Sequence, residues 1–239
     1  ASPRGCTNVS FRSLEQLCSW LSLYFAVQAW KQGKSPMVVS LEMSETEVRN
    51  RVFTIMGEGQ WSHRKLSSGQ VEIDDLKKWH KSKVDGRPEF HIISNDSGGE
   101  VTPSVLRGKI DQYKPDFIIV DYLQLMSPNQ KSDNETVRMK NLSRELKLMS
   151  ISEEVPIIAI SSATPDDVTK LDTVPTLGQT AWSRQIAYDA DWVLALGRGS
   201  NSDVIECVFR KNRNGFMGEF FVQVDFDKGW YKYKSFEDN

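Results

Sequence analysis

The feature that most constrains the fold is residues 117–126, Phe-Ile-Ile-Val-Asp-Tyr-Leu-Gln-Leu-Met, in which four apolar residues run directly into a carboxylate. An apolar run without polar alternation is typical of a strand buried on both faces, as in a parallel sheet covered by helices. Asp121 would then lie at the carboxyl end of a central strand, where open α/β sheets bind their ligands. Taken alone, Asp121 could equally be a strand-terminal residue that caps the next turn.

The segments around this run alternate between strand and helix patterns. A chain of this kind predicts an α/β fold with a mostly parallel central sheet flanked by helices. Two further β segments near the end, on either side of a turn, predict a C-terminal antiparallel hairpin extension. The other strands are expected at residues 37–41, 90–94, 155–161, 191–196, 204–209 and 220–226, and the main helices at 21–32, 44–57, 102–113 and 135–150, with a short amphipathic helix before residue 20.

Composition and net charge do not identify what kind of molecule the protein binds. The 239 residues can bury one large core, and a net charge of -2 gives no global basic field, although a basic loop remains compatible with it. Cys6, Cys18 and Cys207 lack metal-ligand spacing, so we expect reduced thiols in a cytosolic protein. We see no apolar run of membrane-spanning length and no signal-peptide pattern.

Two of the expected strands end in carboxylates, Glu42 after residues 37–41 and Asp121 after residues 117–120. Neighbouring parallel strands would bring both groups to one edge of the sheet. One carboxylate can hold Mg²⁺ through water while the other polarises an attacking water, as in phosphoryl transfer. Acidic residues at strand ends are common in α/β chains, so the pair alone is a weak signal.

Four motifs occur in one order along the chain: Ser-Leu-Glu-Met-Ser at 40–44, Ile-Ile-Val-Asp-Tyr-Leu-Gln-Leu-Met at 118–126, Asp-Ala-Asp at 189–191 and Lys-Asn-Arg-Asn-Gly at 211–215. Together they resemble the C-terminal motor domain of DnaB-like replicative helicases, hexameric ring enzymes with a RecA-like core. The resemblance implies that residues 1–239 form a single RecA-like motor domain.

The resemblance also implies roles for individual residues. Glu42 corresponds to the base that activates water, and Asp121 to the Walker B acid that supports Mg²⁺. Lys211 and Arg213 match the pair that a neighbouring subunit inserts towards the γ-phosphate, although Asn-Gly also suits an ordinary hairpin turn.

Further residues of the nucleotide and DNA sites follow from the same comparison. Gln124 belongs with Asp121 to the nucleotide site, and Ser162 occupies the position of a family glutamine that senses the γ-phosphate. Serine has a shorter reach, which puts this coupling in doubt. Contact with DNA is expected from the loops that carry Lys131 and Lys170, and from Arg184, where the family has glycine. Each of these three cations could instead be an ordinary surface charge.

One family motif is missing. No G-x-x-x-x-G-K-[ST] sequence occurs in the 239 residues. The best register places a missing strand and phosphate-binding loop between Trp20 and Leu21. Either residues are omitted there, or the protein lacks the loop and hydrolyses nothing.

We therefore expect an ATP- and Mg²⁺-dependent ring helicase that translocates on single-stranded DNA and unwinds duplex at a replication fork. The expected partners are single-stranded DNA, five further copies in a homo-hexamer, primase and other replication proteins, with no membrane. The expected location is the cytoplasm of a bacterial or phage-infected cell. The alternatives are a RecA-like recombination ATPase and a catalytically inactive ring subunit or loader.

Overall fold

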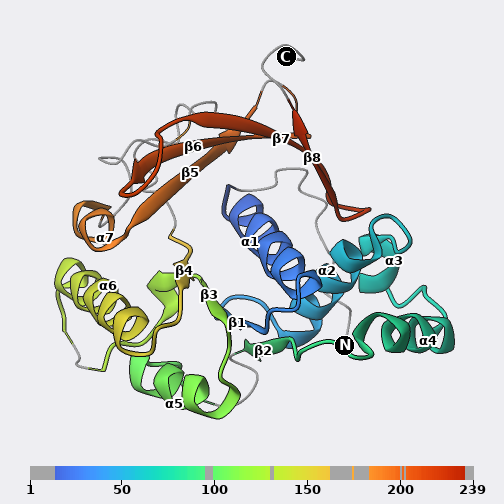
Figure 1. Ribbon diagram of the computed structural model, residues 1–239, viewed down its shortest axis with the longest axis horizontal. Helices are drawn as coiled ribbons and strands as arrows, with labels where there is room; N and C mark the ends of the chain where they lie inside the picture. The colour runs from blue at the N-terminus through green and yellow to red at the C-terminus, as the bar shows by residue number, and fades with distance from the viewer. Residues whose placement is uncertain are drawn as a thin grey trace, which may run out of the picture.

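The computed structural model describes residues 14–94, 99–129, 132–161, 174, 183–199, 201 and 203–234. Helices and strands alternate through the first two thirds of the chain, and strands dominate its end (Figure 1). The helices are α1 Leu14–Lys31, α2 Glu45–Gly57, α3 His63–Ser67, α4 Ile73–Val84, α5 Pro103–Tyr113, α6 Glu135–Ser152 and α7 Ser183–Asp189. The strands are β1 Pro36–Ser40, β2 His91–Ser94, β3 Phe117–Asp121, β4 Ile157–Ala159, β5 Trp192–Arg198, β6 Val204–Asn212, β7 Glu219–Asp225 and β8 Trp230–Lys234.

A four-stranded parallel sheet forms the centre, in the order β2-β1-β3-β4. β3 is an inner strand, and its residues Ile118, Ile119 and Val120 are completely buried. This confirms the prediction that the opening apolar run is a strand covered on both faces.

Helices cover the two faces of this sheet (Figure 1). Val38 and Ile119 pack into one core with α1 and α2, whereas Val39 and Val120 pack into a second core with α5 and α6. Successive side chains of a strand point to opposite faces, so a strand that is apolar throughout supplies both cores. The predicted α/β fold class is therefore confirmed.

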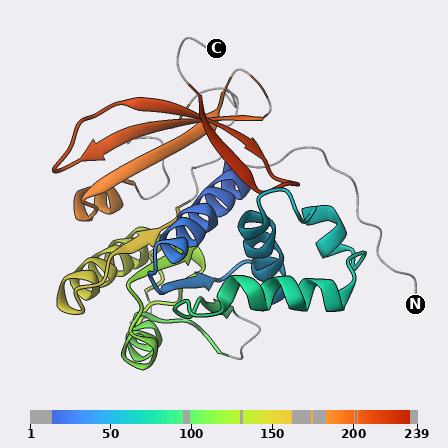
Figure 2. The same cartoon turned by 45° about the vertical axis from the view of Figure 1, so that its right-hand side comes forward.

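A second sheet is antiparallel, in the order β5-β6-β7-β8. It lies across α1 and shares the first core through Leu196, Cys207 and Phe226 (Figure 2). The expected hairpin is thus present as β6 and β7. β8 was not predicted, because its alternation of Trp, Tyr and Lys is short and half-exposed.

α1 differs from the sequence prediction. Two helical segments with a break at Trp20 and Leu21 were expected, but one helix runs through both residues. No glycine or proline interrupts residues 14–31, and both tryptophan and leucine are buried there. The helix ends before Gly33, whose φ of +86° suits glycine.

Helix α2 begins as its sequence predicts. The Ser44 side chain accepts from the Glu47 N–H, and the Glu47 carboxylate accepts from the Ser44 N–H, which together form a capping box. This cap fixes the start of the helix at Glu45, three residues after Glu42. Among the described helices, none is both long and apolar enough to cross a membrane.

Candidate active site

Glu42 and Asp121 lie at the carboxyl edge of the parallel sheet. β1 and β3 pair with Ser40 opposite Asp121, and the Leu41 N–H donates to the Asp121 carbonyl oxygen at 2.7 Å. Glu42 therefore follows the strand that neighbours Asp121, as expected for adjacent parallel strands. The two acids differ in environment, because Asp121 is 2% exposed and Glu42 is exposed.

A short turn holds Glu42 between β1 and α2. The buried Ser40 hydroxyl accepts from the Met43 N–H at 3.1 Å, and the capping box follows immediately. Hydrogen bonds from Ser44 lower the pKa of the Glu47 carboxyl, so that acid stays ionised at the helix start. The turn leaves the Glu42 carboxylate exposed, where it can meet a water molecule.

Arg51 is a charged residue near both acids that the sequence analysis missed. Burial lowers the pKa of its guanidinium, while Asp121, Glu47 and Glu42 oppose that change electrostatically. Its Cζ lies 5.2 Å from the centroid of the Trp20 ring. Nη1 of Arg51 is buried and has no hydrogen-bond partner among the described residues. A cation placed in this way can orient a carboxylate or receive an anionic ligand.

The signal for Arg51 was present in the sequence. The buried face of α2 carries Val48, Val52 and Ile55 at helical spacing, and Arg51 lies on that same stripe. A charged residue on the apolar face of a helix that directly follows Glu42 is a candidate site residue.

Gln124 lies in the short 3₁₀ helix Leu123–Leu125, immediately after β3. Its Nε2 donates to the Ser161 hydroxyl at 2.8 Å, at the end of β4. Its Oε1 is buried without a hydrogen-bond partner in the described part of the chain. A buried acceptor without a partner is available to a ligand. The structure thus connects Gln124 to the strand that precedes Ser162, which itself lies outside the described residues.

Arg138, which the sequence analysis did not select, fixes this segment from α6. Its guanidinium donates to the carbonyl oxygens of Gln124 and Met126 at 2.9 and 3.0 Å, and it forms an ion pair with Glu135. The hydrogen bond with Glu135 raises the pKa of Arg138. The segment from Gln124 to Met126 is therefore held in place by the next helix along the chain.

Lys211 and Arg213 lie near α7, at the end of β6. Lys211 Nζ donates to the carbonyl oxygens of Ala187 and Tyr188 at 2.8 and 3.1 Å, where a cation stabilises the end of a helix. Arg213 forms an ion pair with Asp191. These contacts join the two cations to their own chain's α7 and Asp191 and not to Glu42 or Asp121, and the Arg213 side chain remains 57% exposed.

The Asp-Ala-Asp motif at 189–191 anchors this region. Asp189 is buried and accepts from the Ser143 hydroxyl at 3.0 Å. Asp191 accepts from Lys147 and Arg213, and the hydrogen bond from Lys147 is the main cause that lowers the pKa of its carboxyl. The motif does not by itself predict these contacts, because Ser143 and Lys147 lie more than 40 residues away in the chain.

The structure does not describe the side chains of the three residues predicted to contact DNA. Lys131 and Lys170 lie outside the described residues. Arg184 belongs to α7, but its side chain is not described. Their role therefore stays a prediction.

A parallel sheet with two acids at its carboxyl edge and an antiparallel extension defines a RecA-like α/β domain. The chain belongs to the DnaB-like helicase C-terminal domain family, whose sequence profile matches residues 19–235. It is 29% identical over 222 residues to the replicative DNA helicase DnaB of Geobacillus stearothermophilus, covering 87% of this chain and 47% of that protein. It is 28% identical over 221 residues to the replicative DNA helicase DnaC of Bacillus subtilis, with the same two coverages.

Solved structures agree with the fold. An isolated ATPase domain matches with a TM-score of 0.79 and 22% identity, over 92% of this chain and 80% of that one. A DnaB-like replicative helicase, solved in a study of its interactions with primase, matches with a TM-score of 0.77 and 21% identity, over 89% and 53% of the two chains. The chain spans about half the length of the curated relatives named above.

Proposed function

We propose that this chain is the motor of an ATP-dependent ring helicase, which translocates on single-stranded DNA and unwinds duplex at a replication fork. The observation that carries the proposal is the meeting of Glu42 and Asp121 at one sheet edge, with the largely buried guanidinium of Arg51 nearby. A recombination ATPase is not favoured, because the family profile that matches is that of a helicase domain.

The donor set fits ATP with Mg²⁺. Among the described residues, no group of three or more His, Cys, Asp or Glu side chains could hold a metal alone. Mg²⁺ commonly uses only one or two carboxylates and takes its other ligands from phosphates and water, so Asp121 suffices as the protein ligand, acting through water. When bound, Mg²⁺ would neutralise charge on the phosphates.

We assign the other roles in ATP hydrolysis to residues of this chain. Glu42, exposed beside the buried acid, orients and deprotonates the attacking water. Arg51 balances the negative charge of the two acids in their partly buried setting. Gln124 offers its buried Oε1 as an acceptor, and Ser162 follows the strand end that Gln124 contacts through Ser161.

Lys211 and Arg213 act on the nucleotide of a neighbouring subunit in this proposal. Their anchorage to α7 and Asp191 supports such a role, because a cation fixed on one subunit can be presented rigidly to the next. A site shared between subunits requires an assembly of several copies, which we take to be a homo-hexameric ring. Lys131, Lys170 and Arg184 would face single-stranded DNA in the central channel.

The partners follow from the same proposal. One structural neighbour is a DnaB-like helicase studied with primase, and this supports primase as a partner of the intact protein. A replication motor of this kind would work in the cytoplasm of a bacterial or phage-infected cell.

A second function is favoured by one observation. The 239 residues contain no G-x-x-x-x-G-K-[ST] motif to cradle phosphates. A ring subunit or loader that keeps the fold but hydrolyses nothing would meet this description. ATP hydrolysis by the intact protein in the presence of single-stranded DNA separates the two functions, because only the motor hydrolyses ATP.

The shared site is tested by mixing subunits of the intact protein. Rings of Glu42→Gln alone and of Arg213→Ala alone should both be inactive in ATP hydrolysis. Mixed rings should recover part of the rate, because some interfaces then combine an intact Glu42 with an intact Arg213. Arg107→Ala is the matched control, since Arg107 is similarly exposed and ion-paired to Glu153 elsewhere on the surface. No recovery in mixed rings would contradict action between subunits.

A further inference from the structure

Three basic residues at the end of β6 each bind a different segment of the chain. Arg210 Nη2 donates to the Val174 carbonyl oxygen at 3.0 Å. Lys211 binds the end of α7, and Arg213 binds Asp191. The last two contacts fix the cations proposed to act on a neighbouring subunit. The Arg210 contact joins the same strand end to a residue 36 positions earlier in the chain.

A β-bulge sets the position of Arg210. Val193 of β5 lies opposite Lys211 of β6. The next residue of β5, Leu194, lies opposite Phe209, so the register skips Arg210. The extra residue of a bulge bends its strand and re-aims its side chain. The bulge therefore decides both where Arg210 points and how the strand continues into Lys211.

Val174 packs directly against β5. It is 7% exposed, and a Cβ added at Gly197 would lie 2.6 Å from its Cγ2 and 3.2 Å from its Cα. The absence of a side chain at Gly197 thus makes room for Val174 on the strand. Because Arg210 binds its carbonyl oxygen, Val174 is held by both β5 and β6. Its neighbours at 162–173 and 175–182 lie outside the described residues.

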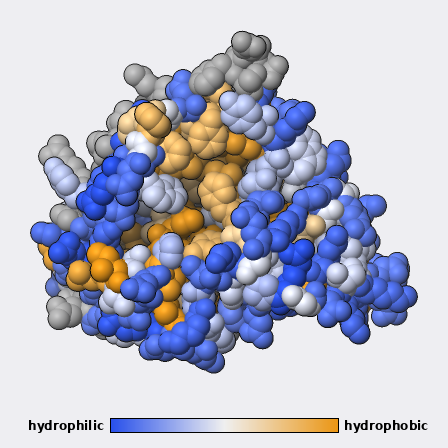
Figure 3. Space-filling model, viewed as in Figure 1, coloured by the Kyte–Doolittle hydropathy of each residue, from blue (hydrophilic) through white to orange (hydrophobic). Residues whose placement is uncertain are grey.

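The end of β6 depends on such polar contacts, because packing becomes weaker along the strand. Ile205 and Cys207 are buried in the core, whereas every residue from 209 to 212 is half-buried. Arg210 also borders a cavity of about 570 Å³, and Figure 3 shows this face hollowed below the antiparallel sheet. A strand end beside an open cavity moves more easily than a half packed into the core. A shift of Val174 can therefore reach the strand end through Arg210.

The sequence connects this contact to two predicted functional segments. Val174 lies four residues after Lys170, in the loop from which contact with single-stranded DNA is expected. Arg210 directly precedes Lys211 and lies three residues before Arg213. One hydrogen bond thus joins the predicted DNA loop to the strand end that carries both cations.

We propose that Arg210 is a positioning residue that couples DNA binding to ATP hydrolysis. When single-stranded DNA binds the loop before Val174, the Arg210 hydrogen bond moves the end of β6 and the two cations on it. This inference rests on the proposed helicase function and names its regulation by DNA. In this role Arg210 contacts neither nucleotide nor DNA. Without DNA, the anchors at α7 and Asp191 keep Lys211 and Arg213 in place, so basal hydrolysis does not need Arg210.

Two variants of the intact protein break the contact in different ways. Arg210→Met removes the hydrogen-bond donors, and Gly197→Ala displaces Val174 from the side of β5. ATP hydrolysis is measured with and without oligo-dT. Both variants should keep the basal rate, whereas stimulation by DNA should fall about fivefold or more. Arg210→Lys keeps a donor and should retain part of the stimulation.

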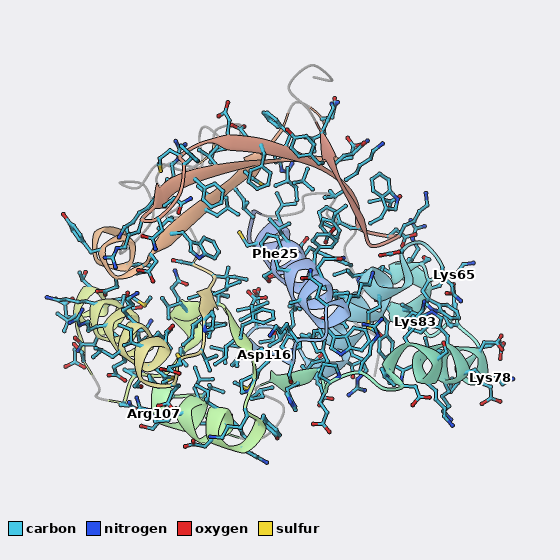
Figure 4. The ribbon with its side chains drawn as sticks, viewed as in Figure 1. Phe25, Lys65, Lys78, Lys83, Arg107 and Asp116 are labelled. Atoms are coloured by element: carbon cyan, nitrogen blue, oxygen red, sulfur yellow. The ribbon has the colours of Figure 1, made fainter. Side chains whose placement is uncertain are left out.

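Arg107→Met is the matched control. Figure 4 shows Arg107 on α5, at the opposite end of the molecule from the antiparallel sheet, and its ion pair is with Glu153. This control should keep the full stimulation by DNA. Binding of labelled oligo-dT, measured by fluorescence anisotropy, should be unchanged in Arg210→Met. A loss of DNA affinity that accounts for the lost stimulation would make Arg210 a DNA contact and overturn the proposal.

Amide hydrogen exchange follows the coupling without hydrolysis. The Arg213 N–H donates to the Asp191 carbonyl oxygen, and the Phe209 N–H to that of Gly218. The exchange rates of these two amides therefore report on the strand end. Adding oligo-dT should change both rates in the wild type and leave them unchanged in Arg210→Met.

The outcomes separate this inference from the proposed function. A wild-type protein that hydrolyses no ATP would contradict the proposed function, and the exchange response to DNA would then decide the coupling by itself. Full DNA stimulation and an unaltered exchange response in Arg210→Met would overturn the coupling and leave the function standing. Equal loss of the basal and stimulated rates would show a general structural role for Arg210, which also overturns the proposal.

Discussion

Arg213 is bound to Asp191 through both its backbone and its side chain. Its N–H donates to the Asp191 carbonyl oxygen at 2.9 Å, and its Nη1 lies 3.0 Å from Asp191 Oδ1. Lys147 of α6 binds the other carboxylate oxygen. The residue proposed to reach a neighbouring subunit is therefore fixed by its own chain, and Asp191 sets its position.

Asp191→Asn should loosen this clamp. The charges are partly exposed, so we expect a loss of only about 0.2–1 kcal/mol in the free energy of unfolding, measured by urea titration. The rate of ATP hydrolysis by the intact protein should also fall, because Arg213 loses its fixed direction. This fall should be larger than the small change in unfolding free energy would explain. Equal hydrolysis by wild type and variant would contradict a positioning role.

The pH dependence of the same pair has a defined sign. Lys147 lowers the pKa of the Asp191 carboxyl in the folded state. A depressed pKa contributes stability above the unfolded value of about 3.9, and this contribution is lost as the pH falls through the folded value. The difference in unfolding free energy between wild type and Asp191→Asn should therefore be constant near neutral pH and shrink below about pH 4.

Gly229→Ala should destabilise the junction between the antiparallel sheet and α2. Gly229 has a φ of +66°, and an added Cβ would lie 2.4 Å from the Thr54 carbonyl oxygen. We expect a loss of roughly 1–3 kcal/mol or more in urea unfolding, from backbone strain and a clash with backbone atoms. Gly108→Ala is the control, because this helical position is open and should gain about 0.5–1 kcal/mol. A neutral Gly229→Ala would contradict the close approach.

Cys207 should be unreactive until the protein unfolds. Its side chain is completely buried in the core shared by α1 and the antiparallel sheet, and burial raises the pKa of its thiol to about 12. In a Cys6→Ser, Cys18→Ser background, pulse alkylation at pH 8 should follow the unfolded fraction across a urea titration. Rapid labelling without denaturant would place the thiol outside the core.

Arg51→Met should lower both activity and stability. The Asp121 carboxylate stays buried after its nearby cation is lost, so we expect a fall of up to about 3–5 kcal/mol in the free energy of unfolding. ATP hydrolysis by the intact protein should fall at least about tenfold, because the charge beside Glu42 and Asp121 is lost. Arg49→Met is the matched control on the same helix, where Arg49 is exposed and paired with Glu45. Equal rates for the two variants would remove Arg51 from the site.

The sequence predicted the parallel part of the fold well, because its strands are unbroken apolar runs. The sequences of β1 and β3 predict strands clearly, and the pairing of these strands brings Glu42 and Asp121 to one edge of the sheet. Caps at Ser44 and Thr102 likewise begin α2 and α5 as local chemistry predicts.

Long-range contacts could not be predicted from local patterns. The guanidinium of Arg138 reaches back to carbonyl groups at Gln124 and Met126, and Asp191 joins α6 to the end of β6. The helices expected before Trp20 and from Leu21 form one helix, because no glycine or proline separates them, whereas the strand and phosphate-binding loop expected between the two residues stay a prediction.

ATP hydrolysis by the intact protein carrying Glu42→Gln tests the central proposal, with single-stranded DNA present and Glu45→Gln as the control at the start of α2. We predict that Glu42→Gln lowers the rate by about 10²–10⁴-fold while binding of an ATP analogue is kept, and that the control remains near wild type. Hydrolysis by Glu42→Gln at the wild-type rate would contradict the assignment of Glu42 as the base.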